Sequence, residues 1–310
     1  MRGKVSIIGG AGRVGATSAY ALELACTCEE LVLVDVAAQA AQGEALDLTH
    51  GRAATGGPRV RAGDYQSLSG SDIVIVTAGL RRRPDEPRLH LIERNASLFR
   101  EILSEVQAVQ LAAEAVLLVV TNPVDVLTYL AATEMGRPAA RTIGLGTLLD
   151  TLRFRSLLGE KLGADPSRVE ALILGEHGDS MVPIFSGLKY DGGPLTEAPR
   201  YSQEAAQEAF EAARTAGAQC LRLKGGAGYA VGLAVREVVA AILEDSGAVL
   251  PVSSLHESGE FAGVALSLPT RLGRGGVQGV VELDLSEDEH TGLTRSAEVL
   301  RQTVARRAGR

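Results

Sequence analysis

The sequence predicts an α/β protein whose N-terminal half is a doubly wound parallel sheet and whose C-terminal half is a mixed α+β domain. In the first half, short apolar runs alternate with stretches of helical period, which is typical of strand–helix–strand crossover units. Runs such as 73–78 are apolar at successive positions, as expected for strands covered on both faces. The length of 310 residues also suits two domains of about 150 residues better than one compact core.

The elements of the first half follow from the spacing of apolar residues. Strands are predicted where apolar residues follow one another, at 5–8, 31–36, 59–62, 73–78, 116–121 and 142–144. Helices are predicted where apolar residues recur about every 3.6 positions, over 15–24, 38–50, 89–106 and 124–133. This alternation places each helix between two strands of the expected sheet.

The pattern changes after Gly146. We expect helices at 148–162 and from about 200 to 244, the second loosened by the glycines of 225–228, and strands at 169–174, 249–253, 264–268 and 280–285. Ser286 and Glu289 have the spacing of a capping box, which predicts that the last helix starts there. We therefore divide the chain into domains at 1–145 and 146–310.

The composition excludes several classes of function. Hydrophobic residues at 45% and charged residues at 22% exclude a disordered chain, and the net charge of −7 provides no cationic field for nucleic acid or an anionic membrane. Cys26, Cys28 and Cys220 form neither a disulfide framework nor a metal-ligand pattern, which favours the reducing cytoplasm and no metal site. We predict no signal peptide, and the apolar run 115–120 is far short of the ~20 residues that span a bilayer.

A glycine-rich turn directly follows the first predicted strand and precedes a helix. Glycines at such a turn let the backbone approach a pyrophosphate, and the helix N-terminus offers free N–H groups to the anion. A chance cluster among 36 glycines is the alternative, but strand, turn and helix are all in place. The predicted cofactor-binding residues of this Rossmann turn are Gly9, Gly10, Gly12, Arg13, Val14 and Gly15.

Asp35 lies near the end of the second predicted strand, twenty residues after Gly15. A carboxylate at that place can accept both hydroxyls of the adenosine ribose and would repel a 2′-phosphate, which favours NAD over NADP. The alternative is that Asp35 only caps the following helix.

Asp150, Arg153 and His177 form the candidate acid–base and anion-binding set. Asp150 and Arg153 are three residues apart, so they project from one face of the predicted helix, and His177 lies in a turn with a glycine on either side of the Glu-His pair. Such a His can exchange protons near neutral pH. The alternatives are a structural His and a solvated ion pair.

With these residues together, the sequence resembles the NAD-dependent lactate/malate dehydrogenase family over nearly its whole length. The stretches that carry the resemblance are Gly9 to Gly15, Asp35, Thr121 to Asp125, Gly146 to Arg155 and Gly175 to Ser180. The resemblance implies an NAD-binding Rossmann domain at 1–145, a catalytic domain at 146–310, and a homotetramer or homodimer.

The resemblance also implies roles for individual residues. His177 would exchange the proton on the substrate C2 oxygen, Asp150 would orient its imidazole, and Arg153 would bind the C1 carboxylate. Arg88, on a closing loop, would polarise the carbonyl. Asn122 would donate to the substrate oxygen, and the remaining implied cofactor contacts are Val120, Asn122 and Asn95.

Arg82 is the position that indicates the substrate. The family separates its substrates six residues before the carbonyl-polarising Arg, where lactate enzymes usually have Gln and malate enzymes have Arg. Together with the small Ala227, Arg82 predicts a dicarboxylate, malate and oxaloacetate, and a likeness to malate enzymes of the archaeal type. Lactate and pyruvate are the alternative, because Glu86 matches the lactate pattern and a shift within 81–83 would change which Arg faces inward. A non-catalytic NAD-binding protein is an alternative of another class.

Overall fold

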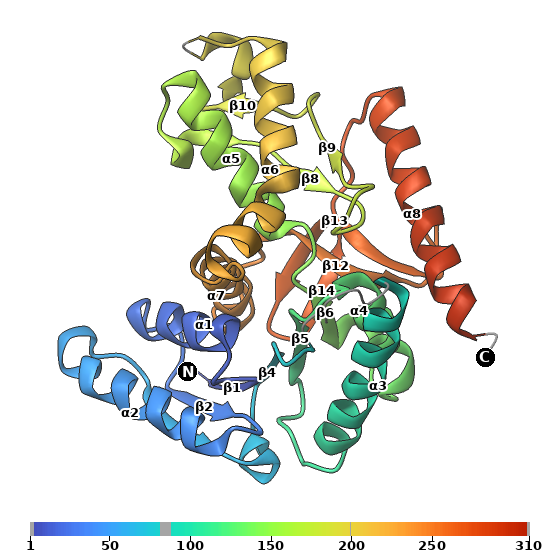
Figure 1. Ribbon diagram of the computed structural model, residues 1–310. Coiled ribbons are helices and arrows are strands. Elements are labelled where there is room, and N and C mark those ends of the chain that lie inside the picture. The colour runs from blue at the N-terminus through green and yellow to red at the C-terminus, as the bar shows by residue number, and fades with distance from the viewer. Residues whose placement is uncertain (1–2, 81–87, 199, 309–310) are drawn as a thin grey trace.

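The computed structural model in Figure 1 describes residues 3–80, 88–198 and 200–308, and one large sheet dominates it. Within these ranges the sheet has nine strands in the order β14-β13-β12-β6-β5-β4-β1-β2-β3. Its parallel part consists of β1 (Lys4–Ile8), β2 (Glu30–Val34), β3 (Arg59–Gly63), β4 (Ile73–Val76), β5 (Val116–Val119) and β6 (Thr142–Gly144). The order 3-2-1-4-5-6 confirms the predicted doubly wound fold.

Helices cover both faces of this parallel sheet. Ile73 and Ile75 of β4 pack into one apolar cluster, whereas Val74 and Val76 pack into another on the opposite face. This explains why the strand is apolar at every position. The helices of the first half are α1 (Arg13–Leu24), α2 (Ala38–Thr55), α3 (Arg88–Gln107) and α4 (Val124–Glu134).

The second half extends the same sheet with three antiparallel strands and adds further long helices around it (Figure 1). These strands are β12 (Val249–His256), β13 (Val264–Gly273) and β14 (Gly276–Val280), and β12 pairs with β6. The helices are α5 (Leu148–Leu162), α6 (Gln203–Lys224), α7 (Tyr229–Leu243) and α8 (Glu287–Ala308). The short elements are β7 (Val169–Glu170), β8 (Ile173–Leu174), β9 (Val182–Pro183), β10 (Lys189–Tyr190), β11 (Gly193–Pro194), η1 (Tyr65–Leu68), η2 (Ala139–Arg141), η3 (Pro166–Arg168) and η4 (Leu195–Glu197).

Two predicted strands were wrong in detail. Residues 281–285 form no strand, because β14 ends at Val280 and only the N–H of Val281 still bonds to Pro269. The predicted strand 169–174 is two short strands, since β7 pairs with β10 and β8 pairs with β9. The capping box at the start of α8 is confirmed by the bonds of Ser286 and Glu289, at 2.8 and 3.3 Å.

Phe154 anchors the helix α5 against α6. Its ring is fully buried and makes edge contacts with Phe185 and Phe210, at centroid distances of 6.2 and 6.3 Å. Such buried aromatic pairs fix the relative position of the elements that carry them. Because Asp150 and Arg153 lie on α5, this packing determines where they stand relative to α6.

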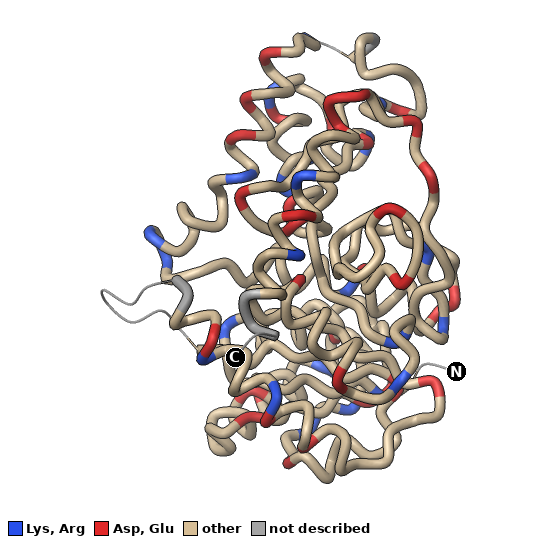
Figure 2. Tube along the Cα trace, turned by 90° about the vertical axis from the view of Figure 1, so that its right-hand side faces the viewer, with Lys and Arg blue, Asp and Glu red and all other residues tan. Residues whose placement is uncertain are grey.

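Two surface properties bear on function. In the view of Figure 2 the positions of acidic and basic residues are interspersed along the described chain trace. Among the described residues, no helix combines the length and apolarity needed to cross a membrane.

Candidate active site

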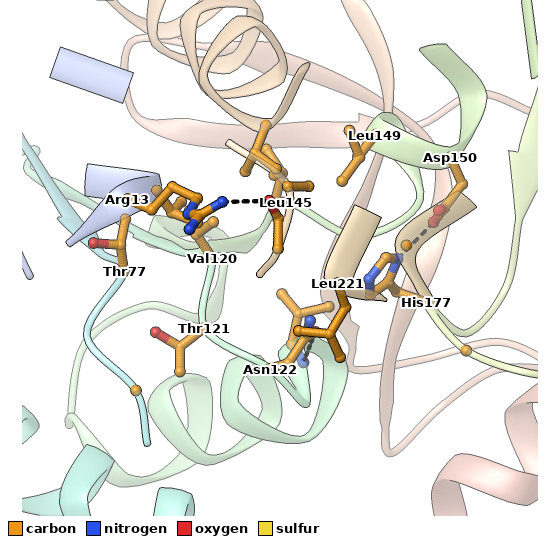
Figure 3. Close-up of a pocket in the computed structure, with 18 of the residues that line it drawn as sticks. Arg13, Thr77, Val120, Thr121, Asn122, Leu145, Leu149, Asp150, His177 and Leu221 are labelled. Atoms are coloured by element: carbon orange, nitrogen blue, oxygen red, sulfur yellow. Dashed lines mark hydrogen bonds and ion pairs between the residues drawn. The ribbon is translucent and has the colours of Figure 1, made fainter. Parts of the chain in front are cut away.

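A cavity of about 580 Å³ lies where the glycine turn, the ends of β4 and β5, the helices α5 and α6 and the turn around His177 meet. It therefore joins the carboxyl ends of parallel strands to residues of the second half, which is where α/β sheets bind their ligands. Figure 3 shows several of its lining side chains, with His177 and Asp150 directed toward one another.

The glycine turn has the geometry of a phosphate cradle. Gly9 has φ +90°, and a Cβ at Gly15 would lie 2.1 Å from the carbonyl oxygen of Gly9, so neither position accepts a side chain. Gly12 precedes α1 in extended conformation, and no side chain caps the helix. The first N–H groups of α1 consequently remain available to an anion.

Asp35 lies beside this turn. Its Oδ2 accepts the N–H of Ala11 at 3.0 Å, and its Oδ1 accepts the N–H of Ala37 at 2.9 Å. The contacts are compatible with both roles considered from the sequence. The bond to Ala37 holds the start of α2, as a helix cap would, and each carboxylate oxygen can still accept a hydrogen bond from a ribose hydroxyl. The residues of the turn and Asp35 fit a dinucleotide.

Arg13 connects the turn to the second half of the chain. Its Nη1 donates to the carbonyl oxygens of Lys224 and Gly226, the latter at 3.1 Å. The same cavity is lined by Gly12, Val14 and Ala227. The guanidinium therefore holds the segment that carries Ala227 against the mouth of the glycine turn.

His177, Asp150 and Arg153 are brought together in the second part of the cavity. His177 Nδ1 lies 2.5 Å from Asp150 Oδ2, and Arg153 Nη1 donates to Asp150 Oδ1 at 3.1 Å. The Asp150 side chain is 1% exposed, against 20% for His177 and 13% for Arg153. Asp150 is thus fully buried between two partners that both reach the cavity.

The electrostatics of this group favour a protonated imidazole. Burial alone would lower the pKa of His177, but the charge and hydrogen bond of Asp150 and the charge of Asp125 outweigh burial and the opposing Arg153. The pKa of His177 is consequently raised above its ordinary value. Since Nδ1 bonds to Asp150, Nε2 is the ring nitrogen left for a ligand.

Asp125 is a second buried carboxylate beside the imidazole. Its Oδ2 accepts the backbone N–H of His177 at 2.8 Å, which fixes the His177 turn to the start of α4. Burial raises the pKa of Asp125 to about 6, although the nearby Ser253 and His177 partly lower it. Below that pKa the carboxyl group is neutral.

Replacing Asp125 by Asn should therefore change how stability depends on pH. A raised carboxyl pKa means that the folded protein binds more protons than the unfolded chain, so wild-type stability falls as pH rises from about 4 through 6. The loss is on the order of 2 to 3 kcal/mol. Asn keeps an acceptor for the His177 N–H and removes the titration. Denaturant unfolding at several pH values would contradict this if the two proteins lose stability in parallel.

The other predicted residues differ in how far the structure describes them. Val120, Asn122 and Asn95 all line the cavity. Asn122 accepts the N–H of Val124 at 3.3 Å, whereas Asn95 accepts the N–H of Leu80 at 2.7 Å. Asn95 therefore holds the segment that leads into 81–87. Arg82 lies outside the described residues, as does the side chain of Arg88, whose backbone begins α3.

Two polar residues near the site were not predicted from the sequence. Asp125 belongs to the Asn-Pro-Val-Asp stretch that contributed to the family resemblance, but nothing in the spacing showed that it would bond to His177. Arg214 lines the same cavity from α6, and no motif marks it. Within the described part of the chain, no group of three or more His, Cys, Asp and Glu residues could hold a metal ion.

Known proteins resemble this chain along its whole length. The chain is 42% identical over 304 residues to an L-lactate dehydrogenase of Synechococcus sp. (strain JA-3-3Ab), which covers 97% of this chain and 98% of that protein. It is 43% identical over 311 residues to the L-lactate dehydrogenase of Salinibacter ruber, with 98% and 97% covered. The solved ligand-bound structure of the minor L-lactate dehydrogenase from Enterococcus mundtii superimposes with a TM-score of 0.92 at 35% identity, covering 98% of both chains.

These relatives do not support the prediction that the chain is nearer to the malate enzymes, since they are named L-lactate dehydrogenase. The malate prediction depended on two single positions, Arg82 and Ala227, whereas sequence identity is measured over the whole chain. The comparisons agree with the sequence prediction on the family and on the cofactor.

Two family models match, the lactate/malate dehydrogenase NAD binding domain over residues 3–144 and the lactate/malate dehydrogenase alpha/beta C-terminal domain over residues 147–308. The chain therefore belongs to the lactate/malate dehydrogenase family and is an NAD-dependent oxidoreductase that acts on the CH–OH group of a small 2-hydroxy acid.

Proposed function

We propose that this enzyme interconverts pyruvate and L-lactate with NADH and NAD, using residues 1–145 to bind the cofactor and residues 146–310 to complete the substrate site. The observation that carries the proposal is the hydrogen-bonded set His177–Asp150–Arg153, which faces the same cavity as the glycine turn. The choice of pyruvate is supported by the names of the relatives.

The proposed mechanism assigns His177 as the acid and base. Bound NADH supplies the hydride that reduces the substrate C2 carbonyl. The protonated Nε2 of His177 donates its proton to the oxygen of that carbonyl, which becomes the hydroxyl of the 2-hydroxy acid. In the reverse direction neutral His177 accepts the proton. Asp150 holds the ring by its Nδ1 and stabilises the imidazolium, so the charged form is available near neutral pH.

Arg153 is proposed to bind the carboxylate of the substrate. Its guanidinium uses Nη1 for Asp150, and the remaining N–H groups of the fork are available to a carboxylate. In a 2-oxo acid the carboxylate carbon is bonded directly to the C2 carbonyl carbon. A ligand whose carboxylate is held by Arg153 therefore presents its C2 carbonyl beside His177. Arg88 is proposed to polarise that carbonyl, and Asn122 to donate to the same oxygen.

Oxaloacetate and malate are the second candidate pair, favoured by Arg82 and Ala227. A guanidinium at position 82 could pair with a second carboxylate, and Ala227 lines the cavity with a small side chain. With pyruvate bound, a guanidinium at position 82 that faced the methyl group would be desolvated without a partner. This would cost on the order of several kcal/mol of binding free energy.

Steady-state kinetics on pyruvate and oxaloacetate separate the two candidates. We expect pyruvate to have the higher kcat/KM. A kcat/KM for oxaloacetate at least tenfold higher than that for pyruvate would contradict the pyruvate proposal and support the second candidate. Tenfold corresponds to about 1.4 kcal/mol of transition-state stabilisation. In that case Arg82→Gln should shift the preference at least tenfold toward pyruvate. No NADH oxidation with any 2-oxo acid would instead favour a non-catalytic NAD-binding protein.

The association of the chain is a separate proposal. The family resemblance implies a homotetramer or homodimer, and the molar mass in solution, measured by light scattering, distinguishes the two from a monomer.

A further inference from the structure

Arg13 is the residue through which the dinucleotide end of the cavity contacts the segment that follows α6. It is the first residue of α1, directly after the glycine turn, and its side chain lines the cavity. Its Nη1 donates to the carbonyl oxygen of Lys224, the last residue of α6, and to that of Gly226. The guanidinium therefore links the phosphate cradle to the C-terminus of α6, although 211 residues separate Arg13 from Lys224 in the sequence.

The chain from 225 to 228 is folded around the Arg13 side chain. A Cβ at Gly225 would lie 3.3 Å from Arg13 Nη2, and a Cβ at Gly228 would lie 3.1 Å from Arg13 Cγ. Gly225 also has φ +77°, a backbone conformation that favours glycine. Ala227 lies between these contacts and lines the cavity. This wall residue is therefore held by a loop that contacts Arg13 on both sides.

The end of α6 has little apolar packing to hold it. The buried residues of α6 all lie in its first half, at Ala206, Ala209, Phe210 and Ala213. Near its end Leu221 and Leu223 are 64% and 76% exposed. The next helix, α7, is packed closely on α1, since a Cβ at Gly232 would lie 2.5 Å from the carbonyl oxygen of Thr17. Loss of the Arg13 bonds should consequently loosen the end of α6 and the loop after it, while α7 stays in place.

The charge of Arg13 makes this link sensitive to an anion in the glycine turn. A cation at the start of a helix is repelled by the positive end of the helix dipole, whereas a cation beside C-terminal carbonyls is attracted. Arg13 is in both situations, at the start of α1 and at the end of α6. A pyrophosphate on the first N–H groups of α1 would offset the repulsion. The bonds to Lys224 and Gly226 both use Nη1, so the N–H groups of Nε and Nη2 can meet that anion while the link is kept.

We infer that Arg13 is a positioning residue that couples cofactor binding to substrate binding, because it holds the 224–228 segment more firmly when a pyrophosphate occupies the glycine turn. Arg13 takes no part in the hydride or proton transfer and acts on the substrate through Ala227 and the end of α6. The inference rests on the proposed function only in placing the substrate beside Ala227.

The order of the 224–228 segment can be measured by limited proteolysis. An endoproteinase that cuts after lysine has few sites in this chain, at Lys4, Lys161, Lys189 and Lys224. Cleavage after Lys224 requires local opening of the segment, whereas Lys161 and Lys189 lie outside the described lining of the cavity and serve as references. The probe is ADP-ribose, which carries the pyrophosphate but no nicotinamide. At saturation, we expect ADP-ribose to slow cleavage after Lys224 by about fivefold or more in the wild type and by less than about twofold in Arg13→Gln.

Two further variants separate the link from the effect of charge alone. Arg13→Lys keeps a cation that attracts phosphate, but an ammonium group cannot donate in two directions from a planar fork. It should therefore keep more affinity for ADP-ribose than Arg13→Gln, as measured by calorimetry, and still lose the protection at Lys224. The matched control is Arg222→Gln, since Arg222 is an exposed Arg near the end of α6 that lies outside the described lining of the cavity. It should show the same protection as the wild type.

Kinetics provide a second readout. At saturating NADH, Arg13→Gln should raise KM for pyruvate about fivefold or more and change kcat by less than about threefold, because the wall of the site is loosened while His177 and Asp150 remain paired.

Several results would overturn the inference. Protection at Lys224 that is equal in the wild type and in saturated Arg13→Gln or Arg13→Lys would show that Arg13 contributes only to cofactor affinity. Equal acceleration of cleavage after Lys161, Lys189 and Lys224 in Arg13→Gln would indicate a general structural role. Resistance of Lys224 in Arg13→Gln without ligand would show that the segment is held without Arg13. Turnover of no 2-oxo acid would refute the proposed function, and the cleavage rates would still decide the inference.

Discussion

Replacing His177 by Asn is expected to lower kcat/KM for pyruvate by about 10²- to 10⁴-fold, the usual contribution of a positioned general acid. Asn fits a similar space but has no titratable proton to donate. Because the glycine turn lines the other end of the cavity, with Asp35 bonded to it at Ala11, the dissociation constant of NADH should change little. Stopped-flow rates and NADH fluorescence titration measure the two quantities, and an unimpaired rate would exclude His177 as the acid.

The pH dependence gives the same prediction a sharper form. Reduction requires the imidazolium, so wild-type kcat/KM for pyruvate should be constant at low pH and fall as pH rises through the raised pKa of His177. In Asp150→Asn the main charge and hydrogen bond that raise this pKa are lost, while burial continues to lower it. The midpoint of the profile should therefore move to lower pH, with a large loss of rate at neutral pH.

A control distinguishes this effect from a general loss of structure. Asp191 is a carboxylate of the same type, exposed and paired with Arg168 away from the cavity. Asp191→Asn should leave the midpoint of the profile where it is in the wild type. If Asp150→Asn also leaves the midpoint unchanged, Asp150 does not tune the imidazole.

Replacing Arg153 by Lys is the second change with a large expected effect. Lys keeps the positive charge but loses the planar fork that can hold Asp150 and a carboxylate together. Disrupting a buried charged pair typically costs about 2 to 5 kcal/mol, which corresponds to a loss of about 30- to 5,000-fold in kcat/KM. The loss should appear mostly in KM for the 2-oxo acid, as measured by initial rates at saturating NADH.

Arg168→Lys is the matched control for that variant. Arg168 also forms an ion pair with an Asp, but its side chain is 47% exposed, so its contribution is small. Arg153→Lys with an unchanged KM for pyruvate would contradict the assignment of Arg153 as the carboxylate-binding residue.

Features of the fold and the site that depend on neighbouring residues could be predicted from the sequence. The glycine turn and the strand before it could be predicted because a backbone that returns within 2.1 Å of a Cβ position permits only glycine. The face shared by Asp150 and Arg153 follows from helix geometry alone, and the structure shows both side chains in one ion pair. The NAD cofactor followed from the same turn, and the family match confirms it.

Contacts between distant segments could not be predicted in this way. Arg214 reaches the cavity only because α6 packs on α5, partly through Phe154 and Phe210, and no local pattern encodes that packing. Asp125 bonds to the backbone of His177, which is 52 residues away in the sequence. The strand expected at 280–285 was misplaced because pairing with β13 already ends at Val280.

The most direct measurement is a crystal structure of the enzyme with NADH and oxamate, an unreactive isostere of pyruvate. We expect the carboxylate of oxamate on the guanidinium of Arg153 and its C2 oxygen within about 3 Å of His177 Nε2. A ligand carboxylate bound away from Arg153, or an imidazole that has left Asp150 and points away from the C2 oxygen, would contradict the proposed chemistry.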